Sequence, residues 1–164
     1  MKQVKVVILG PKGAGKTTFI KSLCQNPLSI EAKDGSTLVF DYDSIRYNGL
    51  KVHLFSTPGH RRYKVIRDIV AKGANGVIFI IDSVRGVNEG DLELLGEIRR
   101  KGIPVVVCAN KQDLEGHLSP REVEKLVDGL PVIPTVAKDG TGCREALRTL
   151  LSLVKEGLDR VAPS

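Results

Sequence analysis

GPKGAGKT, residues 10–17, matches the phosphate-loop pattern G-x-x-x-x-G-K-[ST] and decides the fold. The apolar run that precedes it, residues 4–9, has the composition of a strand buried on both faces. A helical pattern follows it, from residue 16 to about residue 25. In this context the backbone N–H groups of the loop and the N-terminus of the helix converge on one anion. An ordinary glycine-rich turn, the alternative, needs neither the strand nor the helix.

Individual residues of this loop have predicted roles toward a bound nucleotide. Gly13 and Gly15 allow the backbone to approach a phosphate closely. Lys16 is expected to bridge the β- and γ-phosphates, and the Thr17 hydroxyl to bind Mg²⁺. The remaining predicted contacts with the nucleotide in this part of the chain are Gly10, Lys12, Ala14 and Thr18.

The rest of the chain alternates strand and helix patterns. Asn48-Gly49 separates two strand-like segments and predicts a hairpin, since both turn positions tolerate positive φ. Strands are predicted at residues 39–47, 51–56, 75–82, 103–109 and 132–136, and helices at 91–101, after Ser119 and at 143–158. This order predicts one α/β domain over residues 1–164, with a doubly wound, mostly parallel six-stranded sheet and one antiparallel edge strand.

Composition excludes several classes of protein. The net charge is +6, and basic clusters lie at residues 60–64 and 99–101. No nucleic-acid-binding motif accompanies either cluster. The cluster at 99–101 is expected to be the solvated end of a helix. Three cysteines without a C-x-x-C pair indicate reduced thiols rather than a zinc site. No apolar run is long enough to span a membrane and no lipidation motif is visible, so we expect a cytoplasmic protein without a membrane anchor.

The choice of base depends on a second motif, Asn110-Lys111-Gln112-Asp113, which directly follows the strand at 103–109. The Asp113 carboxylate can accept hydrogen bonds from guanine N1–H and its amino group, a donor pair that adenine lacks. Asn110 can brace the loop and reach the base, while the stem of Lys111 can lie along the ring. Such a run could be only a polar loop, but its place after a phosphate loop favours GTP and GDP. Contacts with the base are also predicted for Ala137, whose N–H can donate to guanine O6, and for Lys138.

Five ordered motifs resemble those of the Ras-like small GTPases. They are the phosphate loop, Thr37, T-P-G at 57–59, N-K-Q-D at 110–113 and A-K-D-G-T-G at 137–142. Within that superfamily the chain is most similar to the prokaryotic cell-polarity GTPases. The resemblance implies a Ras-like G domain that switches between GTP and GDP, with Thr37 on Mg²⁺ in the GTP state and Gly59 at the nucleotide. It also implies that residues 27–39 and 57–70 change with the nucleotide and contact an effector and a GTPase-activating partner.

Ser56 and His60 depart from the superfamily pattern. Ser56 stands where an Asp usually holds a Mg²⁺-bound water, and Asp41 is either its substitute or a solvent-facing carboxylate at the sheet edge. His60 stands where most members have Gln, as in elongation-factor-type GTPases. It either orients the attacking water, with Lys16 and Thr37 completing the catalytic set, or is an exposed loop residue.

Lys12 and Ser36 bear on the speed of hydrolysis. Lys12 occupies a position that is often Gly, where its side chain either crowds the catalytic water or is exposed. Ser36 stands where some polarity GTPases carry a built-in arginine finger. Arg61, Arg62 and Lys33 are then the candidates to supply its positive charge. We therefore expect slow hydrolysis by a molecular switch. The alternative is a GTP-binding scaffold subunit with little hydrolysis.

Overall fold

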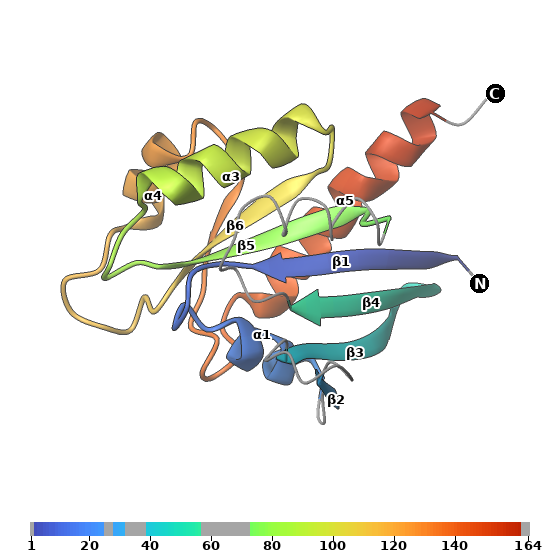
Figure 1. Ribbon diagram of the computed structural model, residues 1–164, viewed down its shortest axis with the longest axis horizontal. Helices are drawn as coiled ribbons and strands as arrows, with labels where there is room; N and C mark the ends of the chain where they lie inside the picture. The colour runs from blue at the N-terminus through green and yellow to red at the C-terminus, as the bar shows by residue number, and fades with distance from the viewer. Residues whose placement is uncertain (1, 25–27, 32–38, 57–72, 162–164) are drawn as a thin grey trace.

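A seven-stranded sheet forms the centre of the protein (Figure 1). The computed structural model describes residues 2–24, 28–31, 39–56 and 73–161. The strands are β1 (Gln3–Leu9), β2 (Leu28–Glu31), β3 (Val39–Tyr47), β4 (Leu50–Ser56), β5 (Gly76–Asp82), β6 (Val105–Asn110) and β7 (Val132–Pro134). Their order in the sheet is β2-β3-β4-β1-β5-β6-β7.

The predicted fold class is confirmed, with one more strand than the sequence indicated. β3 is antiparallel to both β2 and β4, whereas the pairs β1–β4, β1–β5, β5–β6 and β6–β7 are parallel. β3 is therefore the one strand that runs in the opposite direction to the other six, as predicted. It lies next to the edge of the sheet rather than at the edge. The edge strand is β2, which consists of four residues of the segment 27–39 and pairs with β3.

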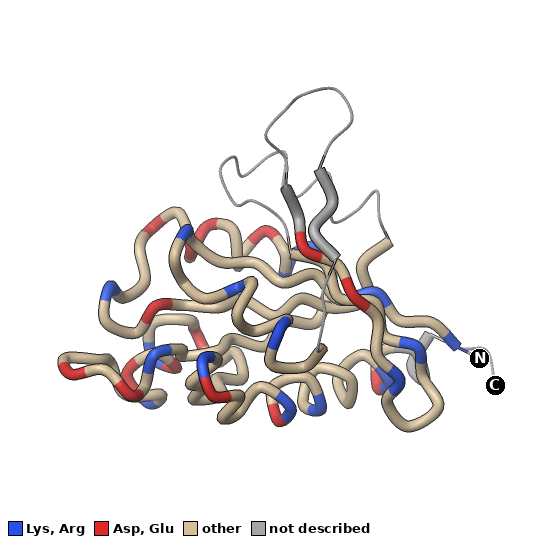
Figure 2. Tube along the Cα trace, turned by 90° about the horizontal axis from the view of Figure 1, so that it is seen from below, with Lys and Arg blue, Asp and Glu red and all other residues tan. Residues whose placement is uncertain are grey.

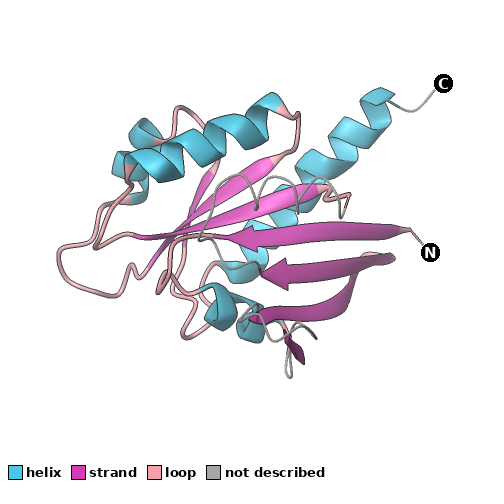
Figure 3. Ribbon diagram, viewed as in Figure 1, coloured by secondary structure: helices cyan, strands magenta, loops and turns pink. Residues whose placement is uncertain are grey.

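Helices cover both faces of the sheet, which makes the fold doubly wound (Figure 3). The helices of the described residues are α1 (Lys16–Leu23), α3 (Glu89–Arg100), α4 (Pro120–Leu126) and α5 (Cys143–Val161). α1 and α5 pack in one apolar cluster, through residues such as Phe19 and Leu147. α3 and α4 pack in a second cluster on the opposite face, through residues such as Ile98 and Val123.

Strands β5 and β6 lie between these two clusters and are buried along their whole length. Their side chains alternate between the clusters, which explains why the sequence shows continuous apolar runs rather than alternation. β1, β5, β6 and β7 are mutually parallel, so their carboxyl ends meet at one edge of the sheet. Loops that follow these strands are therefore brought together at this edge.

Local signals at the helix ends behave as predicted. Ser119 caps α4 in a reciprocal capping box with Glu122. The basic residues 99–101 are exposed at the end of α3, and Arg99 lies 3.8 Å from the carboxylate of Asp128. Blue and red segments are interspersed along the chain in Figure 2. The cluster is thus a solvated helix end, as expected from the sequence.

Candidate functional site

The phosphate loop connects the end of β1 to the start of α1, and two of its three glycines are sterically required. Gly10 has φ of +151°, and a Cβ there would lie 2.3 Å from the Ile80 carbonyl oxygen. Gly15 has φ of +111°, and its Cβ would lie 2.5 Å from Nδ2 of Asn110. Gly13, with φ of +82°, has open space around it, so only its backbone conformation favours glycine.

Helix α1 begins without a side-chain cap, because its N-cap residue is Gly15. The N–H groups of its first turn are therefore left for an external acceptor, and the helix dipole adds positive potential at the same point. Lys16 extends into this region and its Nζ donates to the Gly10 carbonyl at 2.7 Å. Burial lowers the pKa of the Lys16 ammonium. The loop thus offers an anion a set of backbone donors and one partly desolvated cation.

Thr17, Asp41 and Ser56 form a polar cluster where α1 meets β3 and β4. The Thr17 hydroxyl donates to Oδ2 of Asp41 at 2.5 Å, and the Asp41 N–H donates to Ser56 Oγ at 3.0 Å. Asp41 is only 8% exposed and Ser56 only 6% exposed. The alternative of a solvent-facing carboxylate at the sheet edge is therefore wrong. Asp41 instead places a carboxylate beside the loop hydroxyl.

Asn110 connects the phosphate loop to the loops after β6 and β7. Its Nδ2 donates to the Ala14 carbonyl at 2.8 Å. Its Oδ1 accepts from the Thr135 hydroxyl at 3.0 Å and from the Ala137 N–H at 2.9 Å. The predicted bracing role of Asn110, which is 3% exposed, is confirmed. The Ala137 N–H, which the sequence suggested as a donor to guanine O6, thus donates to Asn110 in this structure.

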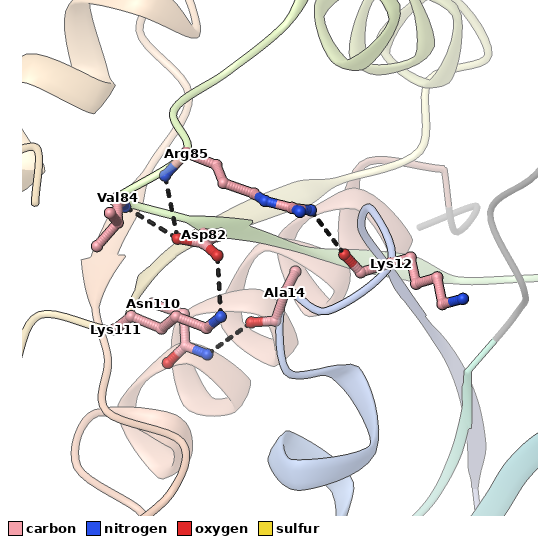
Figure 4. A network of polar contacts seen from close by, with 7 residues as sticks. All are labelled: Lys12, Ala14, Asp82, Val84, Arg85, Asn110 and Lys111. Carbon is pink, nitrogen blue, oxygen red and sulfur yellow. Dashed lines mark hydrogen bonds and ion pairs between the residues drawn. The ribbon is translucent and has the colours of Figure 1, made fainter. Parts of the chain in front are cut away.

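Lys111 and Asp82 form an ion pair beside the phosphate loop (Figure 4). Lys111 adopts φ of +65°, and its Nζ lies 2.9 Å from Oδ2 of Asp82. Oδ1 of Asp82 accepts from the N–H groups of Val84 and Arg85 at 2.9 and 3.1 Å. Burial raises the pKa of Asp82, but the bonds from Lys111, Arg85 and Val84 outweigh it and hold the pKa below its usual value. NH1 of Arg85 in turn reaches the Lys12 carbonyl at 3.4 Å.

Asp82 and Arg85 were not predicted from the sequence as residues of the site. One signal could have found Asp82, because a carboxylate ends the buried strand β5 at the same sheet edge as Asn110. The two residues are register partners across β5 and β6.

A cavity of about 230 Å³ joins the phosphate loop to the loop after β6. Its lining residues are Gly13, Gly15, Thr18, Asn110, Lys111, Asp113, Leu114, Val136, Ala137 and Lys138. Eight of these ten were predicted to contact the nucleotide; Leu114 and Val136 are additions. The carboxylate of Asp113 is exposed and has no hydrogen-bonding partner within the described ranges. Several predicted residues lie outside the described residues: Thr37, Gly59, His60, Lys33, Ser36, Arg61 and Arg62. So do most of the segment 27–39 and all of the segment 57–70.

Residues 1–154 match the ADP-ribosylation factor (Arf) family. The chain belongs to this family. This Arf-family protein is 30% identical over 150 residues to an uncharacterized protein of Methanocaldococcus jannaschii, covering 92% of this chain and 96% of that protein. It is 29% identical over 174 residues to the mutual gliding-motility protein MglA of Myxococcus xanthus, covering 92% of this chain and 89% of MglA. A solved structure, the G domain of the T. maritima FeoB iron transporter, superposes with a TM-score of 0.73 at 26% identity, covering 93% of this chain and 99% of that domain.

Membership in the family confirms the predicted Ras-like superfamily. The chain is a GTP-binding small GTPase of the phosphate-loop class, and the family binds guanine nucleotide. Among the residues that the structure describes, no helix has the length and apolar composition needed to cross a membrane.

Proposed function

We propose that this Arf-family protein is a molecular switch that binds GTP and GDP with Mg²⁺ and hydrolyses GTP slowly. One observation carries the proposal: the phosphate loop and the loop after β6 line a single cavity and are joined by the buried Asn110. A nucleotide in this cavity has its phosphates at the start of α1 and its base at Asp113. Base and phosphate recognition are therefore mechanically connected.

Guanine selectivity is assigned to Asp113. Its carboxylate lies at the cavity and accepts from guanine N1–H and the amino group, whereas adenine would leave it unpaired. Guanine O6 then needs a donor other than the Ala137 N–H, which Asn110 already accepts. Lys138 lines the same cavity, and its N–H donates to no described residue, so this N–H is the group proposed to bind O6.

The residues around Thr17 fit Mg²⁺ because they offer hard oxygen ligands. The Thr17 O–H points at Asp41, so its oxygen lone pairs remain available to a metal beside the phosphate loop. Bound there, Mg²⁺ would neutralise charge on the phosphate oxygens. Asp41 is proposed to hold the hydroxyl and a metal-bound water in place of the missing carboxylate at Ser56. Thr37 is proposed as a second hydroxyl ligand in the GTP state only.

Hydrolysis is assigned to Lys16 and His60, with Thr37 closing the site. Lys16 neutralises charge on the phosphates and His60 orients the attacking water. We expect fewer than about one turnover per minute from the isolated protein, because unassisted small GTPases of this class are slow. Residues 27–39 and 57–70 are proposed to bind an effector and an activating partner. A partner that orders residues 57–70 should raise the rate through His60.

Nucleotide selectivity tests the proposal directly. The protein, freed of nucleotide, should bind GTP and GDP at least about 100-fold more tightly than ATP, and Asp113→Asn should shift preference toward xanthine nucleotides as donor and acceptor exchange places. Glu115→Gln is the matched control, since Glu115 is an exposed carboxylate of the same loop outside the cavity lining. Equal binding of ATP and GTP would overturn the proposal. Single-turnover hydrolysis separates the switch from a scaffold subunit that never hydrolyses.

A further inference from the structure

Arg85 reaches the phosphate loop from the turn between β5 and α3. Its side chain extends along the loop, and NH1 lies 3.4 Å from the carbonyl oxygen of Lys12 (Figure 4). Ala14 of the loop accepts the Asn110 amide, and Figure 4 shows Lys12 farther from Asn110 and Lys111 than Ala14 is, on the side of the loop away from the base loop. The guanidinium therefore lies at the end of the loop that is farthest from the base, where the terminal phosphate of a bound nucleotide is expected.

The backbone of Arg85 is held in place by Asp82. Oδ1 of Asp82 accepts the N–H groups of both Val84 and Arg85, and the Asp82 carbonyl accepts the Gly86 N–H at 2.9 Å. Oδ2 of the same carboxylate pairs with Lys111 in the base loop. Arg85 is thus anchored on a turn that is tied to the base loop, which reduces the entropy lost when its side chain meets a substrate.

The charge of Arg85 is not used elsewhere in the described part of the chain. The residue is exposed, and no described carboxylate lies within ion-pair distance of its guanidinium. Only one of its five N–H donors has a described partner, the Lys12 carbonyl. A long, exposed hydrogen bond of this kind contributes little to stability. The remaining donors of this permanent cation are free to meet phosphate oxygens.

We propose that Arg85 is a catalytic residue for GTP hydrolysis, a built-in arginine that neutralises charge at the γ-phosphoryl group. The proposal rests on the proposed function. In the reaction the water oxygen bonds to the γ-phosphorus while the bond from that phosphorus to the β–γ bridging oxygen breaks. The electron pair of the broken bond stays on the bridging oxygen, which becomes a terminal oxygen of GDP, and the proton released by the water ends on inorganic phosphate. Arg85 donates to the oxygens on which negative charge grows.

Removal of the guanidinium should slow the chemical step more than it weakens binding. We expect Arg85→Ala to reduce the single-turnover rate of GTP hydrolysis roughly 10- to 100-fold, because GTPases with such an arginine in the same chain reach about 10⁻² s⁻¹ whereas those without it reach about 4 × 10⁻⁴ s⁻¹. GDP affinity should change by no more than about threefold, because the ground state needs the other loop donors more. Arg85→Lys keeps the charge but not the two-pronged geometry, and should recover only part of the rate. Arg100→Ala, which removes an exposed arginine of α3, is the control.

A transition-state analogue gives an independent readout. GDP with aluminium fluoride and Mg²⁺ should form a complex with the unmodified protein and with Arg100→Ala, but not with Arg85→Ala. If Arg85→Ala hydrolyses GTP and binds the analogue as the unmodified protein does, the role of Arg85 is overturned while the switch function stands. If Arg85→Ala instead lowers the melting temperature and GDP affinity without a change in hydrolysis at saturating nucleotide, Arg85 is only a brace of the loop and the proposal is again overturned. If the unmodified protein binds no guanine nucleotide, the proposed function itself fails.

Discussion

Replacement of Asn110 by Ala should separate three structural elements that its side chain now joins. The amide makes hydrogen bonds to Ala14, Thr135 and Ala137, and all three partners are buried. The Thr135 hydroxyl can rotate to another acceptor. The Ala14 carbonyl and the Ala137 N–H are fixed in the backbone, so Asn110→Ala leaves both without a partner.

The cost follows from the desolvation of those two groups. An unsatisfied buried donor or acceptor costs about 1–3 kcal/mol, and the loss of packing around the missing amide adds to it. We therefore expect Asn110→Ala to lower the free energy of unfolding by about 3–5 kcal/mol. In a chain of this length that corresponds to a fall in melting temperature of roughly 8–15 °C.

Urea unfolding of the nucleotide-free protein measures this cost, because bound nucleotide would add its own stabilisation to the native state. Asn88→Ala is the matched control. It removes an exposed Asn that caps α3, and should cost about 1 kcal/mol. Asn110→Asp keeps the two bonds that Oδ1 accepts but turns a carboxylate oxygen toward the Ala14 carbonyl, so it should be at least as destabilising as Asn110→Ala. If Asn110→Ala costs no more than Asn88→Ala, Asn110 does not connect the loops energetically.

Three further predictions concern other parts of the described chain. Asp41→Asn should raise the Mg²⁺ concentration needed to retain GDP by about tenfold or more, whereas Asp43→Asn, on the same strand, should not; Mg²⁺ titrations of nucleotide release decide this. Burial, the charge of Asp43 and a hydrogen bond to it raise the pKa of Cys24 to about 11, so native Cys24 should resist alkylation at neutral pH and react only after unfolding, as mass spectrometry would show. Burial and the charges of Lys51 and Lys5 lower the pKa of His53, so the unfolded chain takes up a proton first. The free energy of unfolding should therefore fall as pH drops through about 6.5, and His53→Gln should reduce that fall in urea titrations.

The sequence predicted best those features that depend on a residue's own neighbours in the chain. β5 and β6 are recognisable because each is apolar along its whole length, and their observed bounds lie within two residues of the predicted ones. β2 was missed because a four-residue edge strand is stabilised by its pairing with β3 rather than by its own composition.

The same distinction holds in the candidate site. The phosphate loop and the Asn110–Asp113 loop act through backbone geometry that their glycines and polar residues encode locally. The contacts of Asp82 and Arg85 depend instead on where the end of β5 falls relative to β6 and to Lys12. Such contacts are set by tertiary structure, so spacing within the sequence does not reveal them.

Asp41 lies between these two cases, because the pairing register of β3 and β4 could have predicted its position from the sequence. A two-residue turn at Asn48-Gly49 pairs Tyr47 with Leu50, and the same register brings Tyr42 opposite Phe55. One further step along both strands places Asp41 opposite Ser56, where the Asp41 N–H meets the Ser56 hydroxyl. The carboxylate that we propose as the replacement for the one missing from the end of β4 thus lies at the facing position of the antiparallel neighbour, where it accepts the Thr17 hydroxyl. In this proposal the departure at Ser56 changes which strand carries the carboxylate, while the carboxylate itself stays beside the phosphate loop.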